Sequence, residues 1–430
     1  MFSKRSMTFV MLIALLVLVF GTMGIGTSQA AELWHYWLSG GEKEALNSLV
    51  DGFKAAYPAD TIKESGIPGN TPELRRQLSA AFMANKPPEL YQSSVGFDLK
   101  SYVDAGQLSP IDDIWTAVNG NKIFPKGLRN MVYFKGHPWA IPLNMHIISH
   151  VFYNKHIFDK YNLTPPTNWK EYDKISDFLR SKGIEPMAAS RDLGVYPFYA
   201  PLVTILGPKG YLKLGMGQIP FTDSRVRKAF LLYKKSLINS FMKGWAGYGW
   251  AEAANPFFEN KVAMYMSGDW AVALFQQRGL KPGVDFDFFP APGTSNVDII
   301  QVDALAAPKG SADSKGTRDF LTYAAGVDGQ KAFNKYKGSV AANLNVEPSI
   351  YNPTMKKTYD RIQQISKKGE VLPNLAYSLL PQSFGEELVR QVTRYALTPD
   401  NATLDSVLTT LENERKRLLD EKKFVNWTAK

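Results

Sequence analysis

The chain has 430 residues, a formal net charge of +10 and no cysteine. A chain of this length forms two or three domains, and burial alone can hold such domains together without disulfides. Its basic residues are dispersed among acidic ones, as in residues 412–423, and this dispersal argues against a nucleic-acid-binding protein, which would concentrate them in one patch.

The first thirty residues have the pattern of a signal peptide. Lys4 and Arg5 precede an apolar run, Met7 to Phe20, that is short for a membrane span, and small residues at 28–30 suit cleavage after Ala30. A lipoprotein would need a cysteine at the cleavage point. We therefore expect an exported protein, in the periplasm, that is not inserted in the membrane once the leader is removed.

The mature chain opens with a predicted strand, turn and helix. Leu33–Trp37 has β character, Ser39-Gly40-Gly41 forms the turn, and apolar residues at 46, 49, 50 and 53 predict the helix. Such junctions lie at the carboxyl edge of an α/β sheet, where ligands bind and where a helix offers unpaired N–H donors. The rest of the chain is expected to be organised around this junction.

Strands and helices are then expected to alternate, which predicts a parallel sheet. Further strands are predicted at 61–64, 89–92, 147–153, 262–266 and 299–307, with a hairpin at 132–142 that turns at Lys135-Gly136. Helices are predicted at 72–83 after the N-cap Thr71, at 169–180, at 224–235 after the N-cap Thr222, at 270–279, and at 317–337 before Gly338. Residues 143–146 are expected to pass from a first α/β lobe to a second.

Motifs of common enzyme classes are missing from the sequence. It contains no Gly-x-Ser-x-Gly, no His-Glu-x-x-His and no phosphate-binding loop. His146 and His150 have the spacing of a metal pair on a helix, but their apolar neighbours favour a strand. We therefore expect no catalytic residue, no metal and no cofactor.

Tryptophans beside glycine-containing turns are the most suggestive feature. A sugar ring has an apolar C–H face and a rim of hydroxyls, so its site needs aromatic plates together with charged hydrogen-bonding groups. The expected plates are Trp37, Trp250 and Trp270, and the expected polar rim is Glu42, Asp303 and Lys337.

Each of these residues also has a structural explanation. Glu42 would complete a capping box with Ser39, and Lys337 would complement the end of a helix. Each tryptophan, taken singly, would be an ordinary core residue. Asp303 is harder to explain in this way, because a lone carboxylate in an apolar run is costly to bury unless it is paired or faces a cleft. Taken together, the positions favour a binding site.

Five short motifs resemble, in order and spacing, those of the family 1 extracellular solute-binding proteins of ATP-binding-cassette importers, in particular the glucose/galactose-binding branch. The motifs are Trp37-x-Ser39-Gly40-Gly41-Glu42-Lys43, Pro142-x-Asn144-x-His146, Gly268-Asp269-Trp270-Ala271, Pro292-Gly293-Thr294 and Lys337-Gly338-Ser339. The resemblance implies an α/β fold of the two-lobed periplasmic-binding-protein type II, with three crossing segments and a sugar bound in the cleft between the lobes.

The resemblance also implies the lobe boundaries, the partners and the contacts. The N-terminal lobe would comprise 31–143 plus 301–340, and the C-terminal lobe 144–300 plus 341–430. The protein, expected to be a monomer, would deliver a mono- or small oligosaccharide to the membrane permease and would catalyse no reaction. Its implied sugar contacts are Trp37, Glu42, Trp250, Trp270, Asp303 and Lys337, with Asn144 and His146 beside the first crossing segment.

Two positions depart from the pattern of the family. Ser94 stands where relatives carry a basic residue, and Tyr377 stands where they carry a stacking histidine. These departures would remove charged donors from the cleft, so we expect a sugar other than glucose, or an oligosaccharide whose second ring lies beside Ser94 and Tyr377.

Two other functions remain open at this point. A secreted glycosidase would use Glu42 and Asp303 as its carboxylate pair. A binding protein of the same fold would instead hold a polyamine or a peptide, because aromatic boxes also hold cations.

Overall fold

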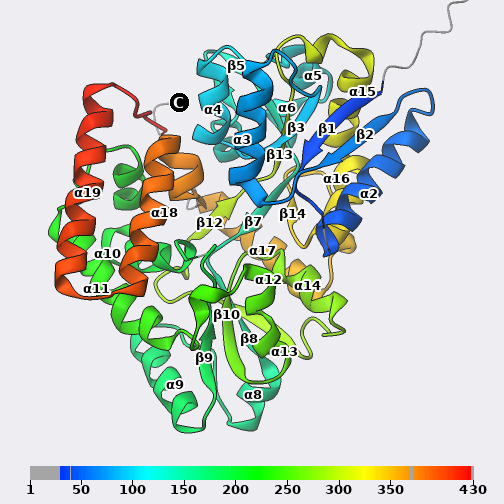
Figure 1. Cartoon of the computed structure of the whole chain (residues 1–430). Helices are drawn as coiled ribbons and strands as arrows, with labels where there is room; N and C mark the ends of the chain where they lie inside the picture. Colours follow the sequence, from blue (N-terminus) through cyan, green and yellow to red (C-terminus); the bar gives the residue numbers. More distant parts are fainter. Residues whose placement is uncertain (1–29, 39, 193, 369–370, 428–430) are drawn as a thin grey trace, which may run out of the picture.

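The computed structural model (Figure 1) describes residues 30–38, 40–192, 194–368 and 371–427. Apart from Ala30, the expected signal peptide lies outside the described residues, and so does Ser39 of the expected capping box. Among the helices in the described part, none has both the length and the apolar character that a bilayer span requires.

The N-terminal lobe is built on a five-stranded sheet with the order β2-β1-β3-β13-β6. Its strands are β1 (Ala31–His35), β2 (Ile62–Gly66), β3 (Leu90–Ser93), β6 (Ala140–Pro142) and β13 (Ala304–Ala306). β1 pairs in parallel with β2 and β3, whereas β13 runs antiparallel to β3 and β6. The predicted parallel strands are therefore confirmed, and one antiparallel strand lies beside them.

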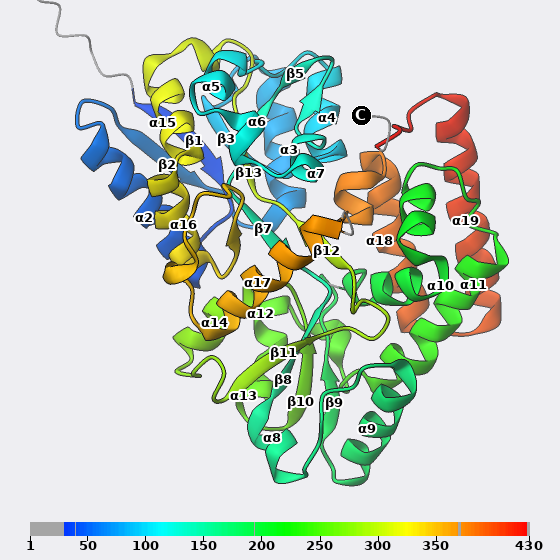
Figure 2. The same cartoon turned by 180° about the vertical axis from the view of Figure 1, so that it is seen from behind.

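Helices cover both faces of this sheet. They are α2 (Gly40–Ala56), α3 (Asn70–Met83), α4 (Phe97–Asp104), α5 (Asp112–Ala117), α6 (Gly120–Ile123), α7 (Lys126–Arg129), α15 (Lys315–Ala325) and α16 (Val327–Lys337). Figures 1 and 2 show α3 and α4 on one face and α15 and α16 on the other. A small hairpin, β4 (Tyr133–Phe134) and β5 (His137–Pro138), turns at Lys135-Gly136 as predicted.

The C-terminal lobe is built on a second sheet with the order β11-β8-β10-β9. Its strands are β8 (His150–Asn154), β9 (Glu185–Ala188), β10 (Val262–Met266) and β11 (Phe286–Pro290). Its helices are α8 (Lys155–Lys160), α9 (Trp169–Ser181), α10 (Tyr196–Gly215), α11 (Ser224–Leu232), α12 (Trp250–Ala253), α13 (Asn255–Phe258), α14 (Ala271–Gln277), α18 (Gln382–Leu397) and α19 (Asn401–Asp420). The predicted second α/β lobe is confirmed.

A third sheet, with the order β14-β7-β12-β15, consists of the strands that connect the lobes. They are β7 (Asn144–Ile147), β12 (Asp298–Gln301), β14 (Val340–Ala341) and β15 (Val371–Pro373), and α17 (Pro353–Lys368) lies between the last two along the chain. The chain passes through this sheet on its way from β6 to β8, from β11 to β13, and from α16 to α18. These are the three crossing segments that the family resemblance implies.

The structure corrects the single strand expected at 299–307. This segment divides into β12 and β13, which belong to different sheets, and Asp303 lies between them. The N–H of Asp303 donates to Asn144 Oδ1 at 2.8 Å rather than to a neighbouring strand. Because the chain changes sheets at this residue, its carboxylate lies where the N-terminal lobe meets the crossing strands.

The helix expected at 317–337 is also divided. Gly326, in an extended conformation, separates α15 from α16, and Gly338 ends α16 in the left-handed region at φ 73°, as predicted. Both predicted N-caps are wrong by one or two positions. α3 begins after Gly69, so Thr71 lies inside it, and Asp223 rather than Thr222 caps α11.

His35 is buried in β1 and makes the stability of the fold depend on pH. Its side chain is 1% exposed, and burial lowers its pKa to about 4, although Glu64 opposes that shift. In the unfolded chain the pKa of this histidine is about 6.5. Between pH 4 and pH 6.5 the unfolded state therefore binds more protons than the folded state. Stability therefore falls as the pH drops through this window, and the contribution of His35 reaches about 3 kcal/mol.

We expect His35→Asn to reduce this pH dependence. In the wild type, the N–H of Trp37 donates to His35 Nδ1 at 3.2 Å. The amide oxygen of the introduced asparagine can accept the same N–H. Urea unfolding of both proteins at pH 7 and pH 4.5 measures the effect. Equal losses of stability on acidification in the wild type and the variant would assign the pH dependence to other groups.

Candidate functional site

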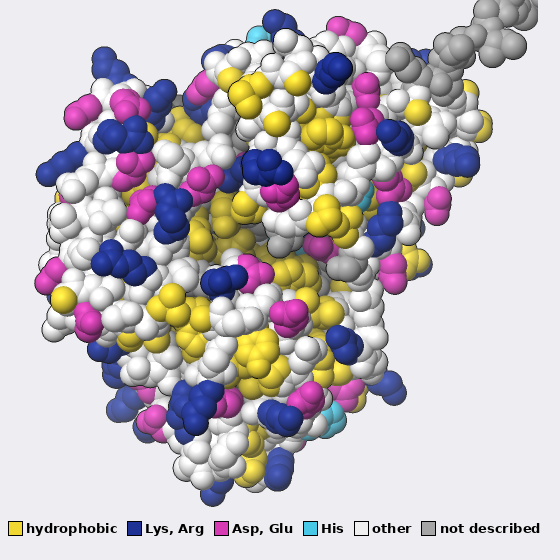
Figure 3. All heavy atoms as spheres, in the orientation of Figure 1, with side chains coloured by type: hydrophobic (Ala, Val, Ile, Leu, Met, Phe, Trp, Pro, Cys, Tyr) yellow, Lys and Arg dark blue, Asp and Glu magenta, His cyan; other side chains and the backbone are white. Residues whose placement is uncertain are grey.

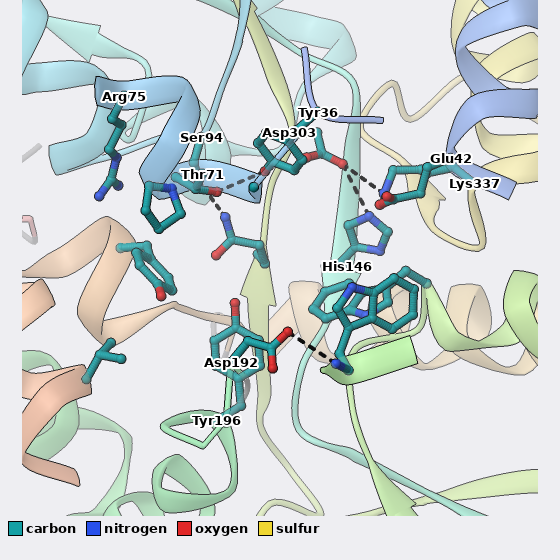
Figure 4. Close-up of a pocket in the computed structure, with 17 residues that line it drawn as sticks. Tyr36, Glu42, Thr71, Arg75, Ser94, His146, Asp192, Tyr196, Asp303 and Lys337 are labelled. Carbon is teal, nitrogen blue, oxygen red and sulfur yellow. Dashed lines mark hydrogen bonds and ion pairs between the residues drawn. The ribbon is translucent and has the colours of Figure 1, made fainter. Parts of the chain in front are cut away.

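A cavity of about 340 Å³ lies between the two lobes, beside the crossing strands. Figure 4 shows Tyr36, Thr71 and Arg75 of the N-terminal lobe facing Asp192 and Tyr196 of the C-terminal lobe. In the space-filling view, hydrophobic side chains lie in a hollow in the middle of the face (Figure 3). The volume is typical of small-molecule sites, which span about 300–1,000 Å³.

Most of the site residues predicted from the sequence lie at this cavity. Eight of the ten predicted residues line the cavity: Glu42, Ser94, His146, Trp250, Trp270, Asp303, Lys337 and Tyr377. They come from both lobes and from β7, although up to 335 positions separate them in the chain. Trp37 and Asn144 do not line it.

The carboxyl edge of the first sheet supplies one wall of the cavity. Tyr36 follows β1 and Ser94 follows its parallel neighbour β3. Glu42 lies in the first turn of α2, which packs closely on α16 and α14 because Gly41 has no side chain. A Cβ atom there would lie 2.5 Å from the carbonyl oxygen of Tyr336. This close approach brings Glu42 beside Lys337, at the end of α16.

A buried ammonium group organises the polar end of the cavity. Lys337, whose side chain is 2% exposed, donates to Glu42 Oε1 at 2.7 Å, and its Nζ lies 3.4 Å from Asp303 Oδ2. Burial opposes ionisation of Asp303, but Lys337 and His146 outweigh it and hold the pKa of this carboxyl below its usual range. Burial likewise opposes the charge of Lys337, and the two carboxylates nevertheless raise its pKa. Asp303 and Lys337 are therefore both charged at neutral pH.

His146 connects this cluster to the C-terminal lobe. Its Nδ1 bonds to Asp269, which follows β10, and its Nε2 lies 3.3 Å from Asp303 Oδ2. Burial and Lys337 act to lower the pKa of His146, whereas Asp269 and Asp303 act to raise it, and the net shift is upward. A protonated imidazole can donate to both carboxylates at once, so His146 joins one carboxylate from each side of the crossing strands.

Asn144 supports the cavity from behind, contrary to the expectation that it contacts a ligand. It is fully buried, and its Nδ2 donates to Asp303 Oδ2 at 2.8 Å while its Oδ1 accepts the N–H of Asp303. These two bonds hold the carboxylate in place. Its Nδ2 also donates to Ser339 Oγ at 3.2 Å, so the side chain is engaged with protein groups.

The structure also corrects the assignment of Trp37 as an aromatic plate. Trp37 is fully buried, and its ring packs at 5.0 Å from that of Phe333 in the core of the N-terminal lobe. Side chains alternate between the two faces of an extended segment, and Leu33, His35 and Trp37 share the core face. Tyr36, on the opposite face, lines the cavity instead.

Aromatic rings form the wall opposite the charged cluster. The ring of Trp270 lies 5.1 Å from that of His146 and 6.5 Å from that of Trp250, both nearly at right angles, and Tyr196 lies 6.1 Å away. Trp270 can take this position because Gly268 has no side chain, since a Cβ there would lie 2.1 Å from the indole ring. The indole is half-buried and so keeps part of its surface for a ligand.

A second polar group lies at the other end of the cavity. Arg75 of α3 donates from Nε to Asp98 Oδ1 at 2.7 Å, and its guanidinium lies 5.7 Å from the ring of Tyr377. Ser94 accepts a hydrogen bond from Gln301 at 2.7 Å. The departures at Ser94 and Tyr377 were expected to remove charged donors from the cleft, and the guanidinium of Arg75 lies near these two positions.

Six polar or aromatic residues at the cavity were not anticipated: Tyr36, Thr71, Arg75, Asp192, Tyr196 and Gln301. Strict alternation along residues 31–37 would have indicated Tyr36. Asp192 lies in a loop, where it accepts the N–H of Trp250 at 3.1 Å and so orients that residue. No local pattern marks Arg75 or Gln301, because only the packing of the lobes brings them to the cavity.

Comparisons with known proteins agree with this architecture. The model of the family described as bacterial extracellular solute-binding protein matches residues 39–331. An uncharacterized ABC transporter extracellular-binding protein of Pyrococcus horikoshii is 30% identical over 93% of this chain and 90% of its own length. A probable sugar-binding periplasmic protein of Brucella melitensis is 28% identical over 81% of this chain and 83% of its own.

Solved structures show the same fold. The bacterial solute receptor AcbH, whose structure is described with a preference for β-D-galactopyranose, superposes with a TM-score of 0.81 at 21% identity, covering 91% of this chain and 99% of its own. A chitin oligosaccharide binding protein superposes with a TM-score of 0.77 at 20% identity, covering 92% of this chain and 100% of its own. The two-lobed type II fold expected from the sequence is confirmed. The chain belongs to the family of bacterial extracellular solute-binding proteins.

Proposed function

We propose that this protein binds a mono- or small oligosaccharide in the cavity between its lobes and delivers it to the membrane permease of an ABC transporter. The observation that carries the proposal is the pairing, in one cavity, of the Trp270 and Trp250 wall with the Lys337, Glu42 and Asp303 cluster. Aromatic faces suit the C–H face of a sugar ring, and the charged groups suit its hydroxyls. The names of the relatives support the same ligand class.

The contacts proposed for the sugar are Glu42, Ser94, His146, Trp250, Trp270, Asp303, Lys337 and Tyr377. Binding would draw the lobes together around the ligand, and the closed form would be the one that docks on the permease. We place the protein in the periplasm as a monomer, after removal of a leader near Ala30. The change of sheet between β6 and β7, and again between β12 and β13, supports lobes of 31–143 plus 301–340 and of 144–300 plus 341–430.

The charge state of the cluster argues against a glycosidase. Such an enzyme needs one carboxyl group with a raised pKa to protonate the leaving group. Glu42 and Asp303 instead share the ammonium of Lys337, and the pKa of Asp303 is lowered. We propose that the protein catalyses no reaction. A polyamine is also a poor fit, because Lys337 and Arg75 stand at the two ends of the cavity.

Sugar binding is expected to leave the ligand intact and to compact the protein. Calorimetry against glucose, galactose, xylose and short oligosaccharides would identify the ligand, and product analysis after long incubation would detect cleavage. At a hundredfold excess over Kd the ligand adds about 2.7 kcal/mol of stability, so the thermal midpoint rises. Solution scattering should report a smaller radius of gyration. Cleaved sugar, or tight binding of a polyamine or peptide in place of sugars, would reject the proposed function.

A further inference from the structure

A groove of about 410 Å³ lies along α18, next to the cavity. Val389 lines both the cavity and the groove, and Arg191 of the groove is the chain neighbour of Asp192 in the cavity. The cavity and the groove therefore meet at Val389. From Val389 to Leu397 the helix rises by about 12 Å, which is room for more than one further sugar ring.

The groove is basic. Arg191, from the loop after β9, and Arg390 and Arg394, from α18, converge on it, and no carboxylate is among the described residues that line it. Thr393 and Thr398 add two hydroxyl groups. Guanidinium groups in a fork geometry bind carboxylates and sulfate esters through paired hydrogen bonds. The lining therefore matches a ligand that is negatively charged.

Two of the three guanidinium groups are held in place and one is available. Glu387 accepts from Arg390 at 2.5 Å, and Ser406 accepts from Arg394 at 3.1 Å. In the part of the chain that the structure describes, the side chain of Arg191 takes part in no hydrogen bond or ion pair. An exposed arginine with no side-chain partner among the described residues is well placed to receive an anionic group.

The helix also offers an apolar surface between the charges. Val389, Thr393 and Leu397 follow one another at intervals of four, so they share one face of α18, and Leu397 is 55% exposed. A sugar ring needs such a face for its C–H groups together with polar groups at its edge. A purely solvated charged surface would not need the apolar stripe.

We propose that the ligand is an acidic oligosaccharide. A neutral ring occupies the cavity, and an outer ring that carries a carboxylate or a sulfate ester lies in the groove on Arg191, Arg390 and Arg394. This inference rests on the proposed function, because it names the substrate class of the same site. The open groove allows the charged ring to keep part of its hydration while the guanidinium groups select for its charge.

The test compares matched ligands and matched variants. Calorimetry would measure the binding of aldobiouronic and aldotriouronic acids and of sulfated disaccharides, each against its carboxyl-reduced or desulfated partner. The variant is Arg191→Gln with Arg394→Gln, and the control is Lys170→Gln with Lys174→Gln on the distant α9, which removes the same charge. The wild type and the control should bind at least one acidic form tenfold or more tightly than its neutral partner, and this ratio should fall to about one in the arginine variant.

The possible outcomes separate this inference from the proposed function. Binding of neutral oligosaccharides by the wild type without any preference for the acidic forms would overturn the inference alone. A preference that survives in the arginine variant would overturn it as well. An arginine variant that binds every sugar normally but fails to support uptake would assign the groove to the permease instead. Failure of all neutral and acidic sugars to bind would reject both the inference and the proposed function.

Discussion

Trp270→Ala is expected to weaken sugar binding by about 2 kcal/mol or more, a loss of roughly thirtyfold in affinity, as is typical when a buried aromatic anchor is removed. The indole packs on His146, Tyr196 and Trp250 at the cavity and lies at the start of α14 rather than in the core of either lobe. Its removal takes away the stacking surface and leaves the charged cluster in place. Calorimetry with the sugar that the wild type binds best measures the loss.

Trp245→Ala is the matched control for this experiment. Trp245 is another half-buried tryptophan of the C-terminal lobe, but it packs on Phe241 and does not line the cavity. Both variants should keep the far-ultraviolet circular dichroism spectrum of the wild type. If Trp270→Ala binds sugar as tightly as the wild type, or if Trp245→Ala loses as much affinity, the role of Trp270 is packing alone.

Lys337→Met is expected to destabilise the fold by about 3–5 kcal/mol, the range measured when one partner of a buried ion pair is removed. Methionine fills similar space but leaves Asp303, which is 6% exposed, without its strongest compensating charge. Replacing both partners, with Lys337→Met and Asp303→Asn, should recover part of this loss, because the more deeply buried carboxylate is then neutral and only Glu42, which is partly exposed, loses its partner. Urea unfolding measures the free energy of unfolding of each variant.

The pH dependence identifies the mechanism. In the wild type the lowered pKa of Asp303 contributes stability above the unfolded value of about 4, and that contribution is lost as the pH falls below it. Without Lys337 this contribution shrinks or reverses. The difference in stability between wild type and Lys337→Met should therefore be largest at neutral pH and should decrease as the pH falls below 4. A difference that stays constant with pH would point to lost packing rather than to the charge of Asp303.

The order of secondary structure was predictable because its causes are local. The opening strand and helix depend on alternation and on the apolar periodicity that follows, and both form, although the strand is β1 (Ala31–His35) rather than 33–37 and Gly40 and Gly41 belong to α2 instead of a turn. The hairpin at Lys135-Gly136 and the end of α16 at Gly338 depend on residues that accept or favour positive φ. The error at Trp37 was also local, since the alternation of the strand assigns its side chain to the core.

Only the tertiary structure determined which residues meet at the cavity. Asp303 was conspicuous as a charge in an apolar run, but its pairing with Lys337 depends on the chain changing sheets between β12 and β13. Arg75 and Gln301 have ordinary sequence surroundings, and they reach the cavity because α3 and a crossing strand pack beside it. Sequence by itself therefore determined the elements, the family and the principal charged and aromatic residues of the site. The groove of arginines and the bridging role of His146 depend on contacts between segments far apart in the chain, which no local pattern encodes.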